Sequence, residues 1–321
     1  MKSIQELQII VEQELAGISY PENPTDLYAP IDYVLALGGK RMRPILLLLA
    51  HQLFDENIEG AIKPALGIEV FHNFTLLHDD IMDDAPLRRG QQTVHEKWNP
   101  NVGILSGDTM LVQAYQLMAA ANQKVLKQVL DVFSQTAIEV CEGQQYDMDF
   151  ETQLEVQIAE YLKMIEYKTA VLLAGALKIG ALTGGASLEE ADHLYEFGRN
   201  IGIAFQLKDD LLDVFGNQEK FGKQVGGDIL ANKKTYLYLQ SLADAKGAQK
   251  EALEYWFSSK EFDATEKVQA VKAIYSELQV EEQTTAQMQA YYKVAMQHLS
   301  EVTGDKRGLE QFASMLMVRE S

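Results

Sequence analysis

The chain is poor in proline and cysteine, and it carries no excess of positive charge. All seven prolines lie at or before Pro100. Because proline inside a helix costs about 3 kcal/mol, the rest of the chain is free to form long uninterrupted helices. Cys141 is the single cysteine, so an internal disulfide framework is excluded and a reducing compartment is favoured. We expect Cys141 to be a small buried hydrophobic residue.

Other absences narrow the class further. The net charge of −19 argues against nucleic-acid binding, which needs a basic surface. The longest apolar run, around Pro44 to Ala50, is far too short to span a bilayer. The stretch from Met1 to Gly17 lacks the basic start and apolar middle of a signal peptide. We therefore expect a cytoplasmic protein with no nucleic-acid partner and no transmembrane segment.

The apolar pattern predicts an all-α protein. No segment alternates apolar and polar residues long enough to suggest a sheet, and 47% hydrophobic residues can fill a sizeable core. Residues 62–83 are apolar on nearly every side, which places this helix inside a bundle. An irregular segment around the first three prolines and a break at Gly38-Gly39 are expected before a helix near Pro44. Further helices are expected at 102–121, 124–150, 156–181, 187–215, 228–245, 248–258, 264–302 and 308–319.

The domain organisation is expected to be simple. The sequence shows no linker, low-complexity stretch or fixed-period repeat, so a single-domain helical bundle over residues 1–321 is the simplest account. Ser187 with Glu190 three residues later reads as a capping box that starts one of the helices.

Two aspartate clusters are the strongest chemical signal. Asp79-Asp80-Ile81-Met82-Asp83 and Asp209-Asp210-Leu211-Leu212-Asp213 share one spacing, with the outer aspartates four residues apart. This spacing puts both carboxylates on one helical face, where like charges repel. Mg²⁺ would remove the conflict, because it takes oxygen ligands and commonly bridges carboxylates to phosphates. The alternative is a solvated acidic helix end, but both clusters adjoin apolar sequence.

Basic residues accompany the two clusters. Any one of them alone would be ordinary surface charge, but phosphate groups are bound by arginine through paired hydrogen bonds and by lysine as a point charge. The candidates are Lys40, Arg41, Arg43, Arg88, Arg89, Lys168, Lys223, Lys233 and Lys234.

These stretches together resemble the trans-isoprenyl diphosphate synthases, also called polyprenyl synthetases, over almost the whole chain. Two aspartate motifs with Arg-Arg-Gly after the first are highly specific for this family. The matching stretches are GGKRMRP at 38–44, HNFTLLHDDIMDDAPLRRG at 72–90, GILSGDTML at 103–111, EGQQYD at 142–147, EYKTA at 166–170, FQLKDDLLD at 205–213 and GKQVGGDILANKKT at 222–235. The resemblance implies the isoprenoid-synthase fold, a helical bundle around a central cavity.

The resemblance also implies roles for individual residues. Lys40, Arg43, His72 and Arg89 are similar to the pocket for isopentenyl diphosphate. Asp79, Asp83 and Asp209 resemble the ligands of about three Mg²⁺ ions. The remaining polar candidates resemble the site of the allylic diphosphate; they are Arg88, Lys168, Thr169, Gln206, Lys223 and Lys233. His78 is expected to be structural. Ala231-Asn232 departs from the acidic residue or glycine pair that many members carry before the lysine.

The implied activity is chain elongation. A magnesium-dependent prenyltransferase of this type condenses isopentenyl diphosphate with dimethylallyl, geranyl or farnesyl diphosphate, and the family favours a homodimer. Phe74, five residues before Asp79, and Thr75, four before it, resemble the pattern of short-chain members, so we expect an all-trans product of fifteen to twenty carbons. The absence of a two-residue insertion in the first motif favours twenty.

Other classes of protein share parts of this pattern. A class I terpene cyclase lacks the GGKRMRP pocket and the second aspartate motif of this form. A di-iron bundle uses two Glu-x-x-His pairs, and Glu69 to His72 and Glu190 to His193 have that spacing. A longer-chain polyprenyl diphosphate synthase, or a non-catalytic subunit of one, is the remaining alternative; such a subunit would have lost aspartates or basic residues that are present here.

Overall fold

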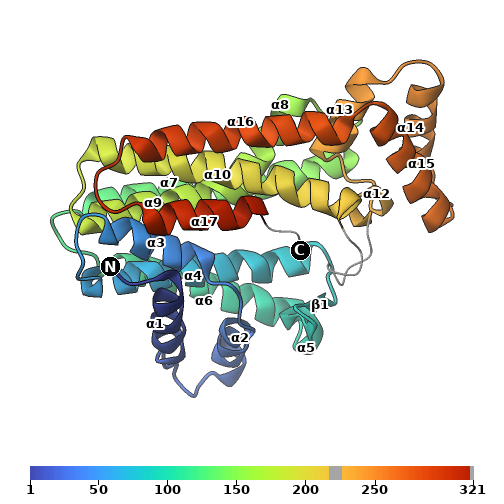
Figure 1. The fold of residues 1–321 in the computed structure, drawn as a ribbon. Coiled ribbons are helices and arrows are strands. Elements are labelled where there is room, and N and C mark those ends of the chain that lie inside the picture. The colour runs from blue at the N-terminus through green and yellow to red at the C-terminus, as the bar shows by residue number, and fades with distance from the viewer. Residues whose placement is uncertain (217–225, 319–321) are drawn as a thin grey trace. The chain divides into compact units, whose positions relative to one another are not determined.

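The computed structural model describes residues 1–216 and 226–318, and these are helical almost throughout (Figure 1). The all-α prediction is therefore confirmed. No helix within the described ranges is long and apolar enough to cross a membrane. The elements in chain order are α1 Ile4–Ala16, α2 Thr25–Ala36, α3 Met42–Gln52, α4 Glu59–Met82, β1 Leu87–Arg88, β2 Gln91–Gln92, α5 Val94–Lys97, α6 Pro100–Met118, α7 Leu126–Thr152, α8 Ile158–Ile165, the π-helical turn η1 Glu166–Ala170, α9 Val171–Gly184, α10 Leu188–Phe215, α12 Gly227–Leu230, α13 Tyr236–Asp244, α14 Ala248–Ser258, α15 Ala264–Glu277, α16 Val280–Ser300 and α17 Arg307–Val318.

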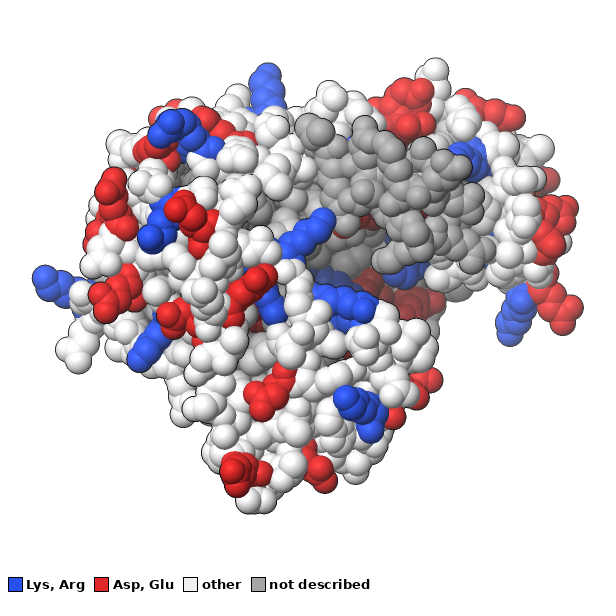
Figure 2. Space-filling view, turned by 60° about the horizontal axis from the view of Figure 1, so that its bottom comes forward, with Lys and Arg blue, Asp and Glu red and all other residues white. Residues whose placement is uncertain are grey.

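The backbone contacts group the chain into two compact units. Unit 1 comprises residues 1–135, 175–195 and 302–309, and unit 2 comprises residues 136–174, 196–301 and 310–321. The expectation of one domain over 1–321 stays a prediction. Acidic and basic side chains both spread over the face drawn in Figure 2, with uncharged residues between them.

Unit 1 is organised around α4. This helix packs along α6 and against α3, while α1 and α2 run at a steep angle to that layer (Figure 1). Glycines make the α4–α6 contact close, because a Cβ at Gly107 would lie 2.2 Å from the His78 ring and one at Gly103 would lie 2.8 Å from Ile81. Most of α4 is buried, as its all-round apolar pattern predicted.

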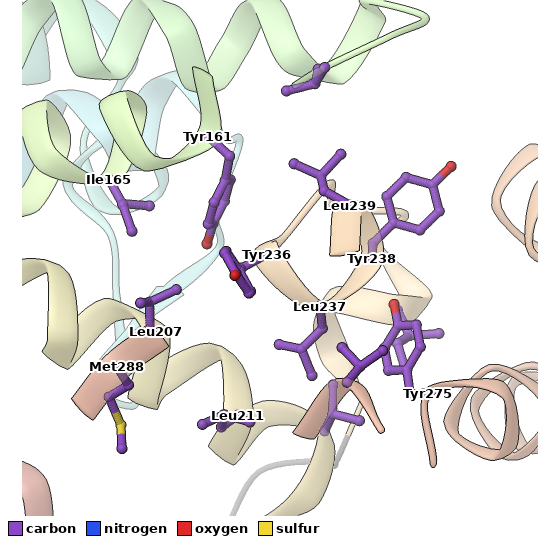
Figure 3. Packing of buried hydrophobic residues seen from close by; sticks show 14 of the residues in the cluster. Tyr161, Ile165, Leu207, Leu211, Tyr236, Leu237, Tyr238, Leu239, Tyr275 and Met288 are labelled. Atoms are coloured by element: carbon purple, nitrogen blue, oxygen red, sulfur yellow. The ribbon is translucent and has the colours of Figure 1, made fainter. Parts of the chain in front are cut away.

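Unit 2 has its own hydrophobic core, built from α8, α10, α13, α15 and α16. Figure 3 shows large side chains from these helices converging, and among them Leu207, Leu237 and Tyr275 are almost completely buried. Four consecutive residues of α13, 236–239, take part in this core, so the helix is enclosed on most sides. This enclosure fixes the start of α13, directly after Lys233 and Lys234.

The helix boundaries differ from the sequence prediction where single residues adopt left-handed backbone. The helix expected at 264–302 is broken at Gln279, with φ of 56°, into α15 and α16. The helix expected at 228–245 is broken near Asn232, with φ of 55°, into α12 and α13. Neither residue is glycine, and therefore the composition gave no signal for these breaks.

Two further expectations were wrong. The segment around the early prolines is not irregular throughout, because α2 forms there and includes Pro30. The segment that follows α4 contains the short antiparallel hairpin β1–β2, with Arg88 opposite Gln91. Its two-residue turn has positive φ at both Arg89 and Gly90, as hairpin turns of type I′ require. Cys141 is exposed rather than buried, since it lies on the outer face of α7.

The capping box at Ser187 is confirmed by reciprocal hydrogen bonds with Glu190.

The contact of α9 with α3 gives a direct test of unit 1. A Cβ at Gly180 would lie 2.0 Å from the carbonyl oxygen of Leu47, a backbone atom that cannot turn away. We expect Gly180→Ala to reduce the free energy of unfolding by about 1–3 kcal/mol, as overpacking of a tight core does. Gly60→Ala is the control, because a Cβ there meets nothing within 4 Å. Thermal and urea unfolding would measure both, and equal stability of the two variants would contradict the close helix contact.

Candidate functional site

The glycine-rich turn before α3 is held to α4 by Arg41. Its guanidinium lies 2.6 Å from Glu69 and donates a second hydrogen bond to the Leu35 carbonyl, also at 2.6 Å. Both members of the ion pair are buried, and Arg41 has left-handed backbone with φ of 48°. Arg41 therefore acts as an anchor. The neighbouring Lys40 is exposed.

The anchored turn places Arg43 against His72 of α4. Arg43 Nη1 lies 3.0 Å from His72 Nε2, and because arginine can only donate, the imidazole accepts at Nε2. Desolvation lowers the pKa of Arg43 to about 10, with Glu69 acting in the opposite direction. Desolvation and then the nearby arginines hold the pKa of His72 well below its usual range. At neutral pH, Arg43 is thus charged and His72 is neutral.

Arg89 reaches the same turn from the β1–β2 hairpin. It has φ of 52°, and its guanidinium donates to the carbonyl of Gly38. A Cβ at Gly39 would lie 2.9 Å from Arg89 Nη2, so glycine at 39 lets the guanidinium approach the backbone. Among the described residues, neither Arg43 nor Arg89 forms an ion pair with a carboxylate. Their charge is therefore left to attract an anion.

The first aspartate cluster lies at the end of α4. Asp79 and Asp83 lie about 20° to either side of His72 on the helical wheel, roughly two and three turns further along. Asp79 is half-buried and Asp83 is exposed. Asp80 lies on another side, is buried, and receives Arg88 at 2.7–2.8 Å through Nε and Nη2. Arg88, expected at the allylic diphosphate, is thus paired with a carboxylate here.

Unit 2 carries the second group of candidates. Lys168 and Thr169 lie on the π-helical turn η1, a feature that often marks functional sites. A Cβ at Gly143 of α7 would lie 2.2 Å from the Lys168 nitrogen, so this glycine admits the turn. Lys168 Nζ lies 2.5 Å from an Asp147 oxygen, and Thr169 Oγ1 lies 3.4 Å from Gln206 Oε1.

The second aspartate cluster, on α10, concentrates negative charge. Asp210 is buried and accepts a hydrogen bond from the Tyr161 hydroxyl at 2.5 Å; burial raises the pKa of Asp210 to about 8. Burial and then the charge of Asp228 raise the pKa of Asp213. Asp209, expected as a metal ligand, is half-buried on the same face as Asp213.

Lys233 lies beside this acidic group. Its ammonium is 3.6 Å from Asp228 Oδ1, and its backbone N–H donates to the Asp228 carbonyl. The preceding Asn232 has left-handed backbone and accepts a hydrogen bond from Lys267, which is fully buried and lies 4.0 Å from the ring of Phe262. At Ala231-Asn232, where the sequence departs from the family pattern, the Asn232 side chain thus forms a hydrogen bond with Lys267. Lys223 lies outside the described residues.

Both clusters suit a hard divalent cation. Each offers two carboxylates at i, i+4 on one helical face, and Asp213 with Asp228 shows the like-charge repulsion that such an ion relieves. The oxygen donor set matches Mg²⁺ rather than a softer metal. The residues present thus fit the magnesium implied by the sequence.

The candidate chain-length residue Phe74 is buried in unit 1. Its ring lies 4.8 Å from His78 and 5.6 Å from Phe71, while Phe71 and Tyr115 both contact Phe133 edge-on. Thr75 is half-buried and donates back to the His72 carbonyl. His78 contacts the Ile104 carbonyl at 3.3 Å, as a structural residue would.

The di-iron alternative is not supported, because both of its candidate glutamates form other contacts. Glu69 accepts hydrogen bonds from Arg41 and Asn73, and Glu190 is bound by Ser187 and Thr303. Three polar residues near the candidate site were not singled out from the sequence; they are Asp147, Tyr161 and Asp228. Asp147 and Asp228 stand inside the motif stretches, so acidic side chains there were the available signal. Tyr161 stands outside them.

Comparisons with known proteins identify the family of the chain. The family model described as Polyprenyl synthetase matches residues 24–278. A geranylgeranyl diphosphate synthase of Methanosarcina mazei is 45% identical over 231 residues, covering 71% of this chain and 70% of that protein. A geranylfarnesyl diphosphate synthase of Natronomonas pharaonis is 40% identical over 259 residues, covering 74% and 75%.

Solved structures are similar over the whole chain. The crystal structure of a geranylgeranyl pyrophosphate synthase has a TM-score of 0.94 at 42% identity and covers 100% of both chains. Geranylgeranyl pyrophosphate synthetase from Pyrococcus horikoshii has a TM-score of 0.91 at 32% identity, covering 99% of this chain and 97% of that one. The fold and the paired acidic and basic groups are those of a prenyltransferase. The chain belongs to the polyprenyl synthetase family, which confirms the resemblance seen in the motifs.

The role of the first cluster can be tested at its exposed member. We expect Asp83→Ala to lower turnover by at least about a hundredfold, because it removes an oxygen ligand where charge develops on a diphosphate. The fold should persist, since Asp83 is exposed at the end of α4. Glu59→Gln, at the opposite end of the same helix, is the control. Steady-state rates with saturating Mg²⁺ measure the effect, and near-normal turnover of Asp83→Ala would remove it from the metal site.

Proposed function

We propose that this prenyltransferase condenses isopentenyl diphosphate with an allylic diphosphate to give the twenty-carbon, all-trans geranylgeranyl diphosphate. The observation that carries the proposal is the face of α4 that bears His72, Asp79 and Asp83. A cation cluster lies at one end of this face and a carboxylate pair lies at the other. Two diphosphate-bearing substrates need such separate anchoring points.

The isopentenyl diphosphate pocket is assigned to the cluster of Arg43, His72 and Arg89, with Lys40 at its rim. Arg43 and Arg89 supply charge and forked hydrogen-bond donors for a diphosphate. His72 accepts from Arg43 and thereby directs the remaining guanidinium donors. The exposed Lys40 is able to close over a bound anion as a mobile point charge.

The allylic diphosphate is assigned to the aspartate clusters with Arg88, Lys168, Thr169, Gln206, Lys223 and Lys233. Mg²⁺ held by Asp79, Asp83 and Asp209 would neutralise the diphosphate as its carbon–oxygen bond breaks. Lys168 and Lys233 each have an acidic neighbour, Asp147 and Asp228 respectively, that positions the ammonium group. Arg88 would have to leave Asp80 or share it in order to reach a phosphate oxygen.

Three further features are inferred from the family resemblance. We infer about three Mg²⁺ ions per active site, a homodimer, and a cytoplasmic location. The acidic side chains of both clusters support the first inference. The other two rest on the resemblance and on the composition.

The division of the basic residues predicts a split in kinetic constants. We expect Arg43→Ala to raise the KM for isopentenyl diphosphate by roughly ten- to a hundredfold, the loss of about 1.5–3 kcal/mol for a charge-assisted contact. Lys233→Ala should instead impair use of the allylic substrate. Lys63→Ala and Lys246→Ala, both exposed, are the controls. Initial rates with each substrate varied in turn give the constants. Equal damage to both substrates in both variants would refute the division.

The product length is assigned to Phe74. We expect Phe74→Ala to yield products longer than those of the wild type at little cost in total turnover, because the removed ring would open space for the growing tail. Chromatographic sizing of products from labelled isopentenyl diphosphate measures this. Phe71→Leu is the control, since Phe71 is fully buried against Phe133 and should leave product length unchanged.

An unchanged product distribution in Phe74→Ala would make Phe74 a core residue. Its truncation should then cost about 3–5 kcal/mol of stability. The residues that limit product length would then be sought on α6, around Tyr115 and Met118. A wild-type product of twenty-five carbons, as the name of the Natronomonas relative implies for that protein, would overturn the twenty-carbon assignment while keeping the reaction class.

A further inference from the structure

A second cluster of potential metal ligands lies beyond the end of α4. It consists of Asp84, directly after the C-cap Asp83, and of His95 and Glu96 on α5. His95 Nε2 lies 3.9 Å from Asp84 Oδ1 and 3.8 Å from Glu96 Oε1. One ligand atom from each residue falls within 4.8 Å of the others. All three residues belong to unit 1.

His95 has unused bonding capacity inside this cluster. Its side chain is only 5% exposed, and within the described part of the chain neither ring nitrogen has a hydrogen-bond partner. A buried imidazole normally satisfies at least one nitrogen, because an unpaired buried polar group is costly. Its Nε2 instead lies near two carboxylates, at distances too long for a direct hydrogen bond to either.

The distances suit an ion between the groups. Ligands to Zn²⁺ lie about 2.0–2.2 Å from the metal, so two ligand atoms of a tetrahedral site are roughly 3.3–3.6 Å apart. The separations of 3.8 and 3.9 Å exceed this spacing by only a few tenths of an ångström, which a small movement of the exposed carboxylates would remove. The Asp84 side chain is 98% exposed, so its carboxylate can move closer to the other two ligand atoms. One nitrogen and two carboxylates are the donors that Zn²⁺ accepts, whereas Mg²⁺ prefers oxygen alone.

We propose that Asp84, His95 and Glu96 form a divalent-metal site selective for zinc, separate from the magnesium-binding face of α4. Asp84 has left-handed backbone, with φ of 48°, and stands outside the helix that aligns Asp79 with Asp83. Three protein ligands leave the fourth tetrahedral position to water, which the exposed carboxylates admit.

The ion would close the loop that carries Arg88 and Arg89. Asp84 and His95 stand at the two ends of the segment that contains the β1–β2 hairpin. Thr93 already joins these ends, donating to the Ala85 carbonyl at 2.7 Å and through its backbone to Pro86 at 3.2 Å. Bound zinc would add a third link between the two ends of this segment, on the exposed side. It would therefore restrain the hairpin that carries both arginines.

Titration of the full chain with Zn²⁺ in the presence of a large excess of Mg²⁺ tests the site. We expect one Zn²⁺ per chain by calorimetry and by metal analysis after gel filtration. Asp84→Asn and Glu96→Gln should each weaken binding at least about tenfold, since even changes in a metal site's outer shell cost 10–100-fold. Both side chains are exposed enough for these variants to fold, and Glu261→Gln is the control. His95→Gln, which removes the nitrogen ligand, should abolish binding.

Hydrogen exchange supplies a second readout. Zn²⁺ should slow amide exchange in the peptide covering residues 85–94 of the wild type, and it should not do so in Asp84→Asn. Zinc affinity that is unchanged in Asp84→Asn and Glu96→Gln, or that falls only when Asp79 and Asp83 are replaced, would overturn the proposal. No binding of Zn²⁺ at all would do the same.

Discussion

The buried ion pair between Arg41 and Glu69 is the constraint on which the first half of the site depends. Both side chains are almost fully removed from solvent, and Glu69 also accepts from Asn73 one helical turn further along α4. Loss of one partner of such a pair leaves an uncompensated buried charge, which costs about 3–5 kcal/mol. The pair fixes the turn over 38–41 against α4, and that placement brings Arg43, at the start of α3, to His72 and the Gly38 carbonyl to Arg89.

A different constraint shapes the second cluster. In α10, burial keeps the Asp210 carboxyl protonated to about pH 8, and this carboxyl is tied to Tyr161. The central aspartate therefore adds less negative charge than its neighbours at neutral pH. Asp213 and Asp228 repel each other instead, where the backbone of residues 226–228 folds back on α10, and a bound cation would relieve this repulsion. One motif thus places Asp210 in the packing and leaves Asp213 facing a like charge.

The sequence predicted the features that depend on periodicity and on residue type. The all-round apolar pattern of 62–83 gave α4, and Ser187 with Glu190 gave the start of α10. Asp79 and Asp83 were singled out by their spacing and the apolar sequence beside them, and the family resemblance added their role. Breaks at Gln279 and Asn232 were not predictable, because left-handed backbone at a non-glycine residue is imposed by tertiary contacts such as the one from Lys267. The pairing of Arg88 with Asp80 was not predictable either, because it depends on the β1–β2 hairpin that contains Arg88.

The arginines also explain how a chain of net charge −19 can attract a polyanion. Four arginines gather near the turn and the hairpin, and two of them, Arg41 and Arg88, have carboxylate partners. The charged forms of the other two are destabilised: the pKa of Arg43 is lowered by desolvation first and also by Arg89, and the pKa of Arg89 by desolvation first and also by Arg41 and Arg88. Folding has therefore already brought these like charges together, at the expense of stability. A diphosphate that binds there relieves the repulsion, so part of its binding energy comes from the fold rather than from new contacts.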